Sequence, residues 1–365
     1  MELPFTDDVD VPSLSRVFND TTNSYKFYWF LAILDSLQRS DGPQMSMQDL
    51  SMQMVARVWY PLSYYKLSFG TQDQFKSVAQ AVSARIVVQT KGNAPDLIRQ
   101  LRTQLSDIDL TGVYSQVKQL LRWVPYRFIR PFFELELKGL PDHQVNNAIV
   151  SLANGGAKAP YRFDGEAIII NGAWVRYFQR YQYILRGFIN WHLVRFLQKN
   201  NPNVPALSEK LERPVDRDFK IANPFWKTYL TDHPQLTCIY SGQPITTANL
   251  SLDHYLPFSF VAHDQLWNLI PTTKTVNSAK NDWLPDTEVY FNKYAHLQFD
   301  AFQFHAATGQ MKKLEDYSLL FRESTDTIQS SPFEWFRDRL SQTVLPQLQT
   351  AKNMGFSSPF IYRPA

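Results

Sequence analysis

Cysteine is almost absent from this chain, which has 365 residues and a single thiol at Cys238. One thiol cannot form an internal disulfide, which excludes a small disulfide-stapled scaffold and fits a reducing compartment such as the cytoplasm. Long apolar runs are also lacking, because Arg, Lys or Gln interrupts each one before the roughly 18 residues of a membrane span. The first residues, MELPFTDDVDVP, show no basic segment followed by an apolar one, so we expect no secretion signal. We therefore expect a cytoplasmic protein without a membrane partner.

Charge of one sign is not in excess either. Lys and Arg number 37 against 34 Asp and Glu, which leaves a formal net charge of +3. Dedicated nucleic-acid binders are usually more basic, so any basic footprint on this chain must be local. Apolar residues are plentiful, because 44% of the chain is hydrophobic and 15% aromatic. That content is enough for two or three packed domains.

Residues 1–225 have the pattern of a helix-rich domain. The polar residues of 19–24 offer helix caps, and the apolar residues of 24–38 surround most of a helix, which predicts a buried central helix. A second helix is predicted over 47–60, with Pro61 at its end. Further along, 126–137 favours extended segments and 161–170 a hairpin. No catalytic constellation occurs in this region, so we expect it to serve recognition, regulation or partner binding.

A long helix predicted over 173–198 carries arginines among aromatic residues, including Arg176 and Arg180. Arginine with interleaved aromatics can follow a nucleic-acid backbone and stack on bases. The same pattern is typical of an amphipathic structural helix whose arginines are solvated or paired. Both interpretations stay open, and under the first Arg176 and Arg180 are candidate substrate-binding residues.

The segment from 252 to 285 reads LDHYLPFSFVAHDQLWNLIPTTKTVNSAKNDWLP and contains residue types suited to phosphodiester hydrolysis. His254 is a candidate general base, because histidine titrates near neutral pH. Asp253 and Asn277 offer oxygen ligands for a hard divalent ion, Mg²⁺ or Mn²⁺. Adjacent residues of a regular strand point to opposite faces, so we expect a bend or bulge where Asp253 and His254 meet.

The order of these motifs resembles the HNH endonucleases, whose ββα-metal finger occurs in homing endonucleases, colicin DNases and restriction enzymes. In that pattern a first strand and turn, C-x-x-C-G, precede an Asp-His strand. A loop with a middle Asn follows, and a helix carries the final His or Asn. The first motif reads Cys238-Ile239-Tyr240-Ser241-Gly242 here, and the resemblance covers 238–282.

The resemblance implies a role for each matched residue. His254 would be the general base, and Asn268 would pin the loop and orient that base. Asp253 and Asn277 would hold the metal, and Lys280 matches the basic residue one turn beyond the last ligand, a candidate contact to substrate. The alternative is that His254 is a satisfied core histidine and Asn277 an ordinary helix N-cap.

His263 lies in the loop between the Asp-His and Trp-Asn motifs. An imidazole at that place can contact phosphate, so His263 is an accessory substrate-binding candidate.

The segment departs from many members of the family in its thiols. The four positions that hold a structural zinc in those members are Cys238, Ser241, Thr273 and Val276 here. One thiol cannot form a tetrahedral Cys-type site, so we expect no structural zinc. Packing must then hold the finger, and the apolar residues available for it are Tyr240, Leu252, Leu256, Trp267, Leu269, Ile270 and Trp283.

The sequence therefore predicts an α+β protein with three parts. They are a largely α-helical domain at 1–225, an HNH module at 226–290 and a helical C-terminal extension at 291–365. The predicted function is a bacterial-type, metal-dependent endonuclease that cleaves nucleic acid, with DNA more strongly favoured than RNA.

Two alternatives to a constitutive nuclease stay open. One is a latent nuclease effector of an anti-phage defence system that a partner protein or sensor subunit activates. The other is a non-catalytic scaffold that binds nucleic acid. Cleavage that requires a partner would favour the first. Binding without metal-dependent cleavage, unchanged by His254→Ala, would favour the second.

Overall fold

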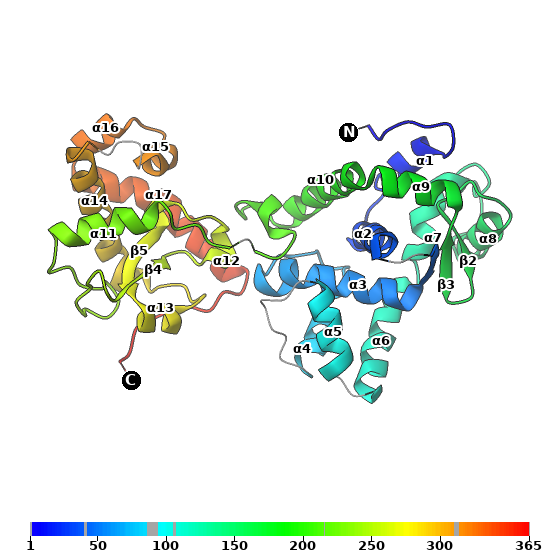
Figure 1. The fold of residues 1–365 in the computed structure, drawn as a ribbon, viewed down its shortest axis with the longest axis horizontal. Coiled ribbons are helices and arrows are strands. Elements are labelled where there is room, and N and C mark those ends of the chain that lie inside the picture. Colours follow the sequence, from blue (N-terminus) through cyan, green and yellow to red (C-terminus); the bar gives the residue numbers. More distant parts are fainter. Residues whose placement is uncertain are drawn as a thin grey trace. The chain divides into compact units, whose positions relative to one another are not determined.

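The structure is a computed structural model that describes residues 2–39, 42–85, 94–104, 107–214, 216–309 and 314–364. It is an α+β structure, as predicted, with many helices and two small antiparallel sheets (Figure 1). The chain divides into two compact units, Met1–Pro202 with Leu207–Arg213 and Asn203–Ala206 with Pro214–Ala365. Within the described ranges, every helix is too short or too polar to cross a bilayer.

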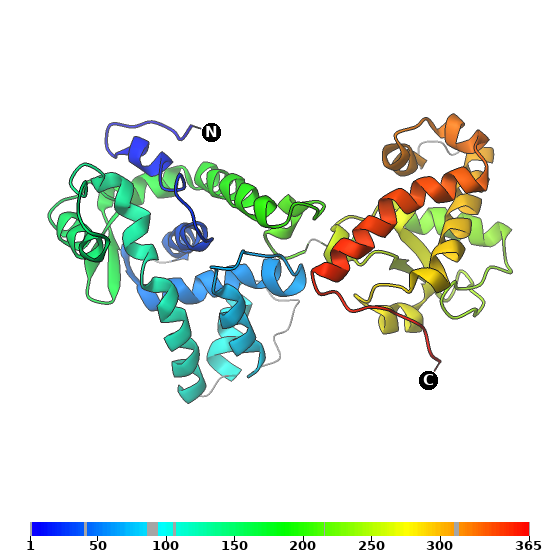
Figure 2. The ribbon, with the colours of Figure 1, turned by 180° about the vertical axis from the view of Figure 1, so that it is seen from behind.

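Helix α2 (Tyr25–Arg39) is the centre of the first unit. Ten of its 15 residues are buried, which confirms the predicted buried helix. It contacts α3 (Met47–Trp59), α7 (Val124–Ile129), α9 (Gly172–Arg180) and α10 (Gln182–Asn200). Figures 1 and 2 show α2 between α3 on one side and α9 and α10 on the other.

A three-stranded antiparallel sheet, in the order β1-β3-β2, completes the first unit. Strands β2 (Tyr161–Asp164) and β3 (Ala167–Ile170) form the predicted hairpin, and β1 (Gln44–Ser46) pairs with β3. The remaining elements are α1 (Val11–Ser15), η1 (Tyr60–Tyr64), α4 (Phe75–Ser83), α5 (Ala94–Gln104), α6 (Asp107–Leu121), η2 (Arg130–Phe133), α8 (Asp142–Asn154) and η3 (Leu207–Lys210).

Two expectations for this unit are wrong. The region 126–137 is not extended, because α7 and η2 occupy most of it. Its buried residues recur at helical spacing, and Pro125 fits the first turn of α7, where a missing N–H costs nothing. The long helix predicted over 173–198 is two helices, since Tyr181, with φ −108° and ψ 20°, leaves the helical region between α9 and α10.

The second unit contains a ββα arrangement. Strands β4 (Leu250–His254) and β5 (Leu269–Thr273) pair antiparallel, and α13 (Lys274–Lys280) follows β5 directly. Helices α11 (Ala222–Asp232) and α14 (Thr287–Ala307) contact β5, and α17 (Phe333–Asn353) packs against α14. The remaining elements are α12 (Phe258–Val261), η4 (Leu266–Asn268), α15 (Glu315–Phe321) and α16 (Thr325–Ser330).

One apolar core joins the ββα arrangement to the helices on both sides of it. Trp226 of α11, Trp267 beside β5, Tyr294 of α14 and Phe336 of α17 belong to the same buried cluster. Tyr294 and Phe336 lie outside 226–290, and their burial against Trp226 and Trp267 stabilises the segment that carries the site. The separate roles expected for 1–225, 226–290 and 291–365 stay predictions.

Trp283 is not part of this core, contrary to expectation. Its side chain is 44% exposed, whereas the next residue, Leu284, is 2% exposed and buried in the cluster. The helix α13 ends at Asn281, whose φ of 44° turns the chain. Backbone hydrogen bonds with Ser357 and Phe360 then hold Leu284 against the cluster. The other six residues expected to fill the finger are buried.

Candidate active site

The end of β4 and the helix α13 bring Asp253 and Lys280 together. The Nζ atom of Lys280 lies 3.1 Å from Oδ2 of Asp253 and donates to the carbonyl oxygen of His254 at 2.6 Å. The hydroxyl of Tyr240 donates to Oδ2 of Asp253 at 3.1 Å. Asp253 and Lys280 are 3% and 0% exposed. A buried ion pair therefore ties the last turn of α13 to β4.

The protonation of this cluster follows from burial and charge. Burial raises the pKa of Asp253, because the carboxylate loses hydration, and the ammonium of Lys280 opposes that shift. Burial and the neighbouring Asp253 raise the pKa of Tyr240 well above its ordinary value. The Tyr240 hydroxyl thus keeps its proton and stays a hydrogen-bond donor to Asp253.

Asn277 lies beside Asp253 on the same side of the finger. Its Nδ2 donates to the carbonyl oxygen of Leu252 at 2.8 Å and to the hydroxyl of Ser251 at 3.0 Å. The side-chain nitrogen therefore faces β4. Thr273, not Asn277, is the N-cap of α13, so the interpretation of Asn277 as an N-cap is wrong.

His254 occupies the other side of β4 and is 4% exposed. Its Nε2 lies 2.8 Å from Oδ1 of Asp264. The ring centroids of Phe219 and Phe258 lie 5.9 and 5.3 Å from that of the imidazole. His254 is thus a buried imidazole that contacts a carboxylate and two aromatic rings.

The bend expected where Asp253 and His254 meet lies after them instead. Asp253 pairs with Ile270 and His254 with Leu269 in regular antiparallel register. The chain bends only from Tyr255 onward. The expected bulge at the pair is therefore wrong, and the two side chains leave β4 on opposite sides.

Asp264 determines which nitrogen of His254 carries a proton. A carboxylate only accepts hydrogen bonds, so the imidazole donates from Nε2 and its Nδ1 is the acceptor in the neutral ring. Burial lowers the pKa of His254, and the charge of Arg217 acts in the same direction, while Asp264 opposes both. A neutral imidazole with a basic Nδ1 at neutral pH is what general-base chemistry requires.

A segment on the N-terminal side of α11 covers this dyad. The backbone N–H of Asp218 donates to Oδ2 of Asp264 at 2.7 Å. Phe219 contacts the imidazole, and the guanidinium of Arg217 lies 5.4 Å from the centroid of the Phe258 ring. Residues 217–219 therefore lie over the candidate base.

Asn268 fixes the bend that follows β4. Its Oδ1 accepts the backbone N–H of Leu256 at 2.8 Å, and its Nδ2 donates to the carbonyl oxygen of the same residue at 2.9 Å. The carbonyl oxygen of Asn268 accepts the N–H of Tyr255 at 2.8 Å. These contacts suit the predicted pinning of the loop, and the predicted effect on the base stays a prediction.

Hydrogen bonds and packing occupy the positions that hold zinc in other fingers. The thiol of Cys238 lies 3.1 Å from the Thr272 hydroxyl, and both residues are buried. Thr273 caps α13 through the N–H of Val276, which is 0% exposed. These contacts link the first turn of the finger, β5 and α13 directly.

The remaining predicted contact residues lie in the loop beside Asp264 or in the other compact unit. His263 is half-buried in the loop beside Asp264, and its ring centroid lies 5.4 Å from that of Trp267. Arg176 and Arg180 are exposed on α9, in the other compact unit. Their contact with substrate stays a prediction.

Sequence reasoning missed two contributors, the carboxylate of Asp264 and the hydroxyl of Tyr240. Asp264 follows His263 in the loop between the Asp-His and Trp-Asn motifs, so an acidic residue in that loop was the available signal. Tyr240 was expected only as apolar filling. Its hydrogen bond to Asp253 depends on how the first turn folds over β4, which no sequence motif specifies.

The donor set suits a hard cation that takes most of its ligands from elsewhere. In the ranges that the structure describes, no group of three or more His, Cys, Asp or Glu is placed to hold a metal ion. Asp253 and Asn277 offer one carboxylate and one amide oxygen. Lys280 and Tyr240 already bond the carboxylate of Asp253, so binding of a divalent ion by Asp253 and Asn277 stays a prediction.

The comparisons with known proteins concern the same segment. Residues 238–285 match the family model of an HNH endonuclease, which spans β4, β5 and α13. Comparison with curated proteins and with solved structures gives no match for the chain. The predicted family is confirmed, and this chain therefore carries an HNH endonuclease segment at 238–285.

Proposed function

We propose that this protein is a metal-dependent endonuclease that hydrolyses phosphodiester bonds of DNA. The contact between His254 Nε2 and Asp264 carries the proposal. It holds a neutral imidazole in the tautomer whose Nδ1 accepts a proton from water. A buried His254 without the Asp264 carboxylate as its hydrogen-bond acceptor would contribute to packing alone.

The other residues of the finger have distinct tasks in this proposal. Asp253 and Asn277 would hold a divalent ion, which supplies neutralisation of the charge that develops on the phosphate. Lys280 balances the buried charge of Asp253 and holds the carbonyl of His254. Asn268 fixes the bend after His254, which limits the positions that the imidazole can take.

Relaxation of supercoiled plasmid tests the proposal. We expect the purified chain to nick or linearise the plasmid with Mg²⁺ or Mn²⁺, and not in excess EDTA. His254→Ala should abolish cleavage, because it removes the base. A labelled RNA of the same sequence, tested in parallel, shows whether DNA is the favoured substrate. Metal-dependent cleavage that persists in His254→Ala would contradict the assignment of the base.

The covering of His254 favours a second candidate, a latent nuclease that a partner activates. Phe219 contacts the imidazole of His254, and the backbone N–H of Asp218 donates to Asp264, the carboxylate that contacts this imidazole. Water and substrate reach a base that is 4% exposed only if residues 217–219 move. A chain that is silent alone and cleaves plasmid after a partner is added would support latency, including a role in anti-phage defence. Plasmid binding without cleavage under any condition would support the scaffold.

A further inference from the structure

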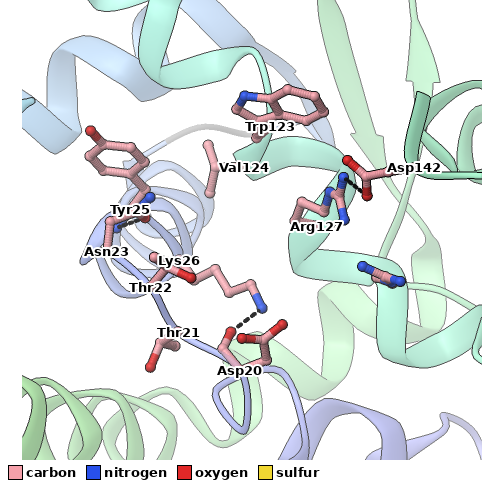
Figure 3. Close-up of a pocket in the computed structure, with 11 residues that line it drawn as sticks. Asp20, Thr21, Thr22, Asn23, Tyr25, Lys26, Trp123, Val124, Arg127 and Asp142 are labelled. Atoms are coloured by element: carbon pink, nitrogen blue, oxygen red, sulfur yellow. Dashed lines mark hydrogen bonds and ion pairs between the residues drawn. The ribbon is translucent and has the colours of Figure 1, made fainter. Parts of the chain in front are cut away.

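A cavity of about 240 Å³ lies in the first unit, between the start of α2 and the start of α7. The loop before α2 forms one wall, and α7 with the residues on either side of it forms the other. Figure 3 shows Trp123 and Lys26 on opposite sides of the open space, with Arg127 beside it. The volume is below the range of about 300–1,000 Å³ typical of drug-sized ligands, so the cavity encloses one compact group and a larger ligand must extend along its edge.

Three cations line this cavity, Lys26, Arg127 and Arg130. Arg127 is paired with Asp142 at 2.7 Å. Arg130 is exposed and forms no ion pair with any residue that the structure describes. Lys26 donates to two backbone carbonyl oxygens, those of Val17 at 3.1 Å and Asp20 at 2.7 Å. Two of the three cations therefore lack a paired carboxylate, although Asp20 also lines the cavity.

Electrostatics around Lys26 favour an added anion. Burial, together with the charges of Arg130 and Arg127, lowers the pKa of Lys26 to about 8 against the opposing effect of Asp20. A phosphate placed among these cations would offset their mutual repulsion. An anionic ligand should therefore bind this cluster with a more favourable free energy than it would bind a single surface cation.

An aromatic side chain completes the lining. Trp123 is 40% exposed at the rim, and the guanidinium of Arg127 lies 5.2 Å from its ring centroid. Exposed indoles beside guanidinium groups are common platforms for bases, because rings and cations both attract an aromatic base. The guanidinium of Arg122 lies 5.1 Å from the same centroid, so two cations lie close to the indole.

We propose that this cavity binds a nucleotide, with the phosphate held by Lys26 and Arg130 and the base packed against Trp123. The ligand is either a free nucleotide or the terminal nucleotide of a strand, since both present the same phosphate and base. This proposal concerns the first unit and does not depend on cleavage by the HNH segment.

Titration of the full chain in EDTA, which prevents metal-dependent cleavage, tests the proposal. The probes are adenosine, inorganic phosphate, adenosine monophosphate and a 5′-phosphorylated single-stranded oligonucleotide. We expect the monophosphate to bind at least about tenfold more tightly than adenosine or phosphate alone, because only it uses both halves of the site. An oligonucleotide that binds more tightly than the monophosphate, and competes with it, would identify a strand end as the source. The reverse order would identify a free nucleotide.

Two variants and a matched control distinguish binding in this cavity from a non-specific effect of the positive charge of the protein. Arg130→Gln should weaken binding of the monophosphate by roughly tenfold, because it removes a charged donor. Trp123→Leu should weaken it by a similar factor through lost stacking. Arg162→Gln removes the same charge from an exposed position on β2, outside the cavity, and should leave the affinity unchanged.

The pH dependence gives a further readout. Affinity should fall as the pH rises from 7 to 9, because Lys26 loses its proton near pH 8 while the arginines stay charged. The proposal is overturned if no probe binds, if phosphate alone binds as tightly as the monophosphate, or if Arg130→Gln and Arg162→Gln have equal effects.

Discussion

Asp264 controls both the orientation and the basicity of His254. It accepts from Nε2 of the imidazole and from the N–H of Asp218, so one carboxylate connects the base to the segment that covers it. Carboxylates that orient a metal-bound histidine commonly contribute about 10–100-fold to metal affinity or activity, and Asp264 contacts the imidazole of His254 in the same manner. The residue is therefore a positioning residue for the proposed reaction.

Asp264→Asn should lower cleavage by about 10–100-fold at its pH optimum, because the imidazole loses its fixed tautomer. It should also move the acid limb of the pH–rate profile to lower pH. Asp264 raises the pKa of His254 against the effect of burial, so its removal lowers that pKa, and the neutral base persists further into acid. Asp218→Asn, which keeps the backbone N–H, is the matched control and should leave the profile in place. An unchanged profile in Asp264→Asn would contradict the role of Asp264.

Asn268→Ala should destabilise the second unit by about 2–4 kcal/mol, since it leaves a buried N–H and a buried carbonyl of Leu256 without partners. Urea unfolding followed by circular dichroism measures the loss. Asn292→Ala on an exposed position of α14 is the control and should change stability by less than about 0.5 kcal/mol. Equal stabilities of the two variants would show that the side chain of Asn268 does not hold the bend.

Local motifs made part of the site predictable at the residue scale. The Asp-His pair, the middle asparagine and the last residues of α13 are close in sequence to the elements that place them. The partners of these residues were not predictable, because Asp264 reaches His254 only after the loop folds back. In 126–133 the helical spacing of the buried residues prevailed over the extended structure expected there, and the short alternation of 134–137 forms no strand either.

At the scale of elements, the ion pair between Lys280 and Asp253 joins α13 to β4. Lys280→Met should destabilise the unit by about 3–5 kcal/mol at pH 8, because a buried carboxylate is left unpaired. Asp253 already has a raised pKa, and loss of the ammonium raises it further. The destabilisation should therefore shrink at pH 5, where the carboxyl takes up a proton and the desolvated charge disappears.

Urea unfolding at the two pH values tests this expectation for α13. Lys274→Met, at an exposed position of the same helix, supplies the control, with little change at either pH. A loss of stability in Lys280→Met that is the same at pH 5 and pH 8 would show that the lysine contributes through packing and not through its charge.

Residues 217–219, which precede α11, form a second connection between elements, because they contact Asp264 and His254 at the end of β4. If it restricts access to His254, Phe219→Ala should raise plasmid cleavage by the isolated chain several-fold, because the imidazole becomes accessible. The gain should vanish when His254→Ala is added, which excludes a contaminating nuclease. Reduced cleavage in Phe219→Ala would instead indicate that the ring holds the base in its working position.

The whole molecule has two units, each with its own core, and the HNH segment shares its core with helices outside the family match. A fragment of residues 214–365 should therefore fold alone, whereas 226–290 should not, because it lacks Phe225 of α11, the rings of α14 after Tyr290 and all of α17. Cooperative urea unfolding and dispersed amide resonances would report folding of each fragment. A folded 226–290 fragment would contradict the dependence on the surrounding helices.

Sequence patterns indicated helices and the finger but not this shared core. Apolar periodicity reveals which face of a helix is buried, and it does not reveal what covers that face. Leu284 and Trp283 illustrate the difference, because both neighbours are large and apolar, and only Leu284, which pairs with Ser357 and Phe360 through its backbone, is buried. The domain boundaries predicted at 225 and 290 were placed at motifs and linkers, and the buried core extends across both of them.

The contacts of Cys238, Thr272 and Thr273 have a consequence for how the protein responds to chelators. Fingers that depend on structural zinc unfold when the metal is removed. Here a thiol–hydroxyl contact and a helix cap hold the same positions. We expect EDTA to stop cleavage while leaving the melting temperature unchanged, and readdition of Mg²⁺ to restore cleavage without a refolding delay. Cellular changes in free divalent ions would then switch a nuclease that is already folded.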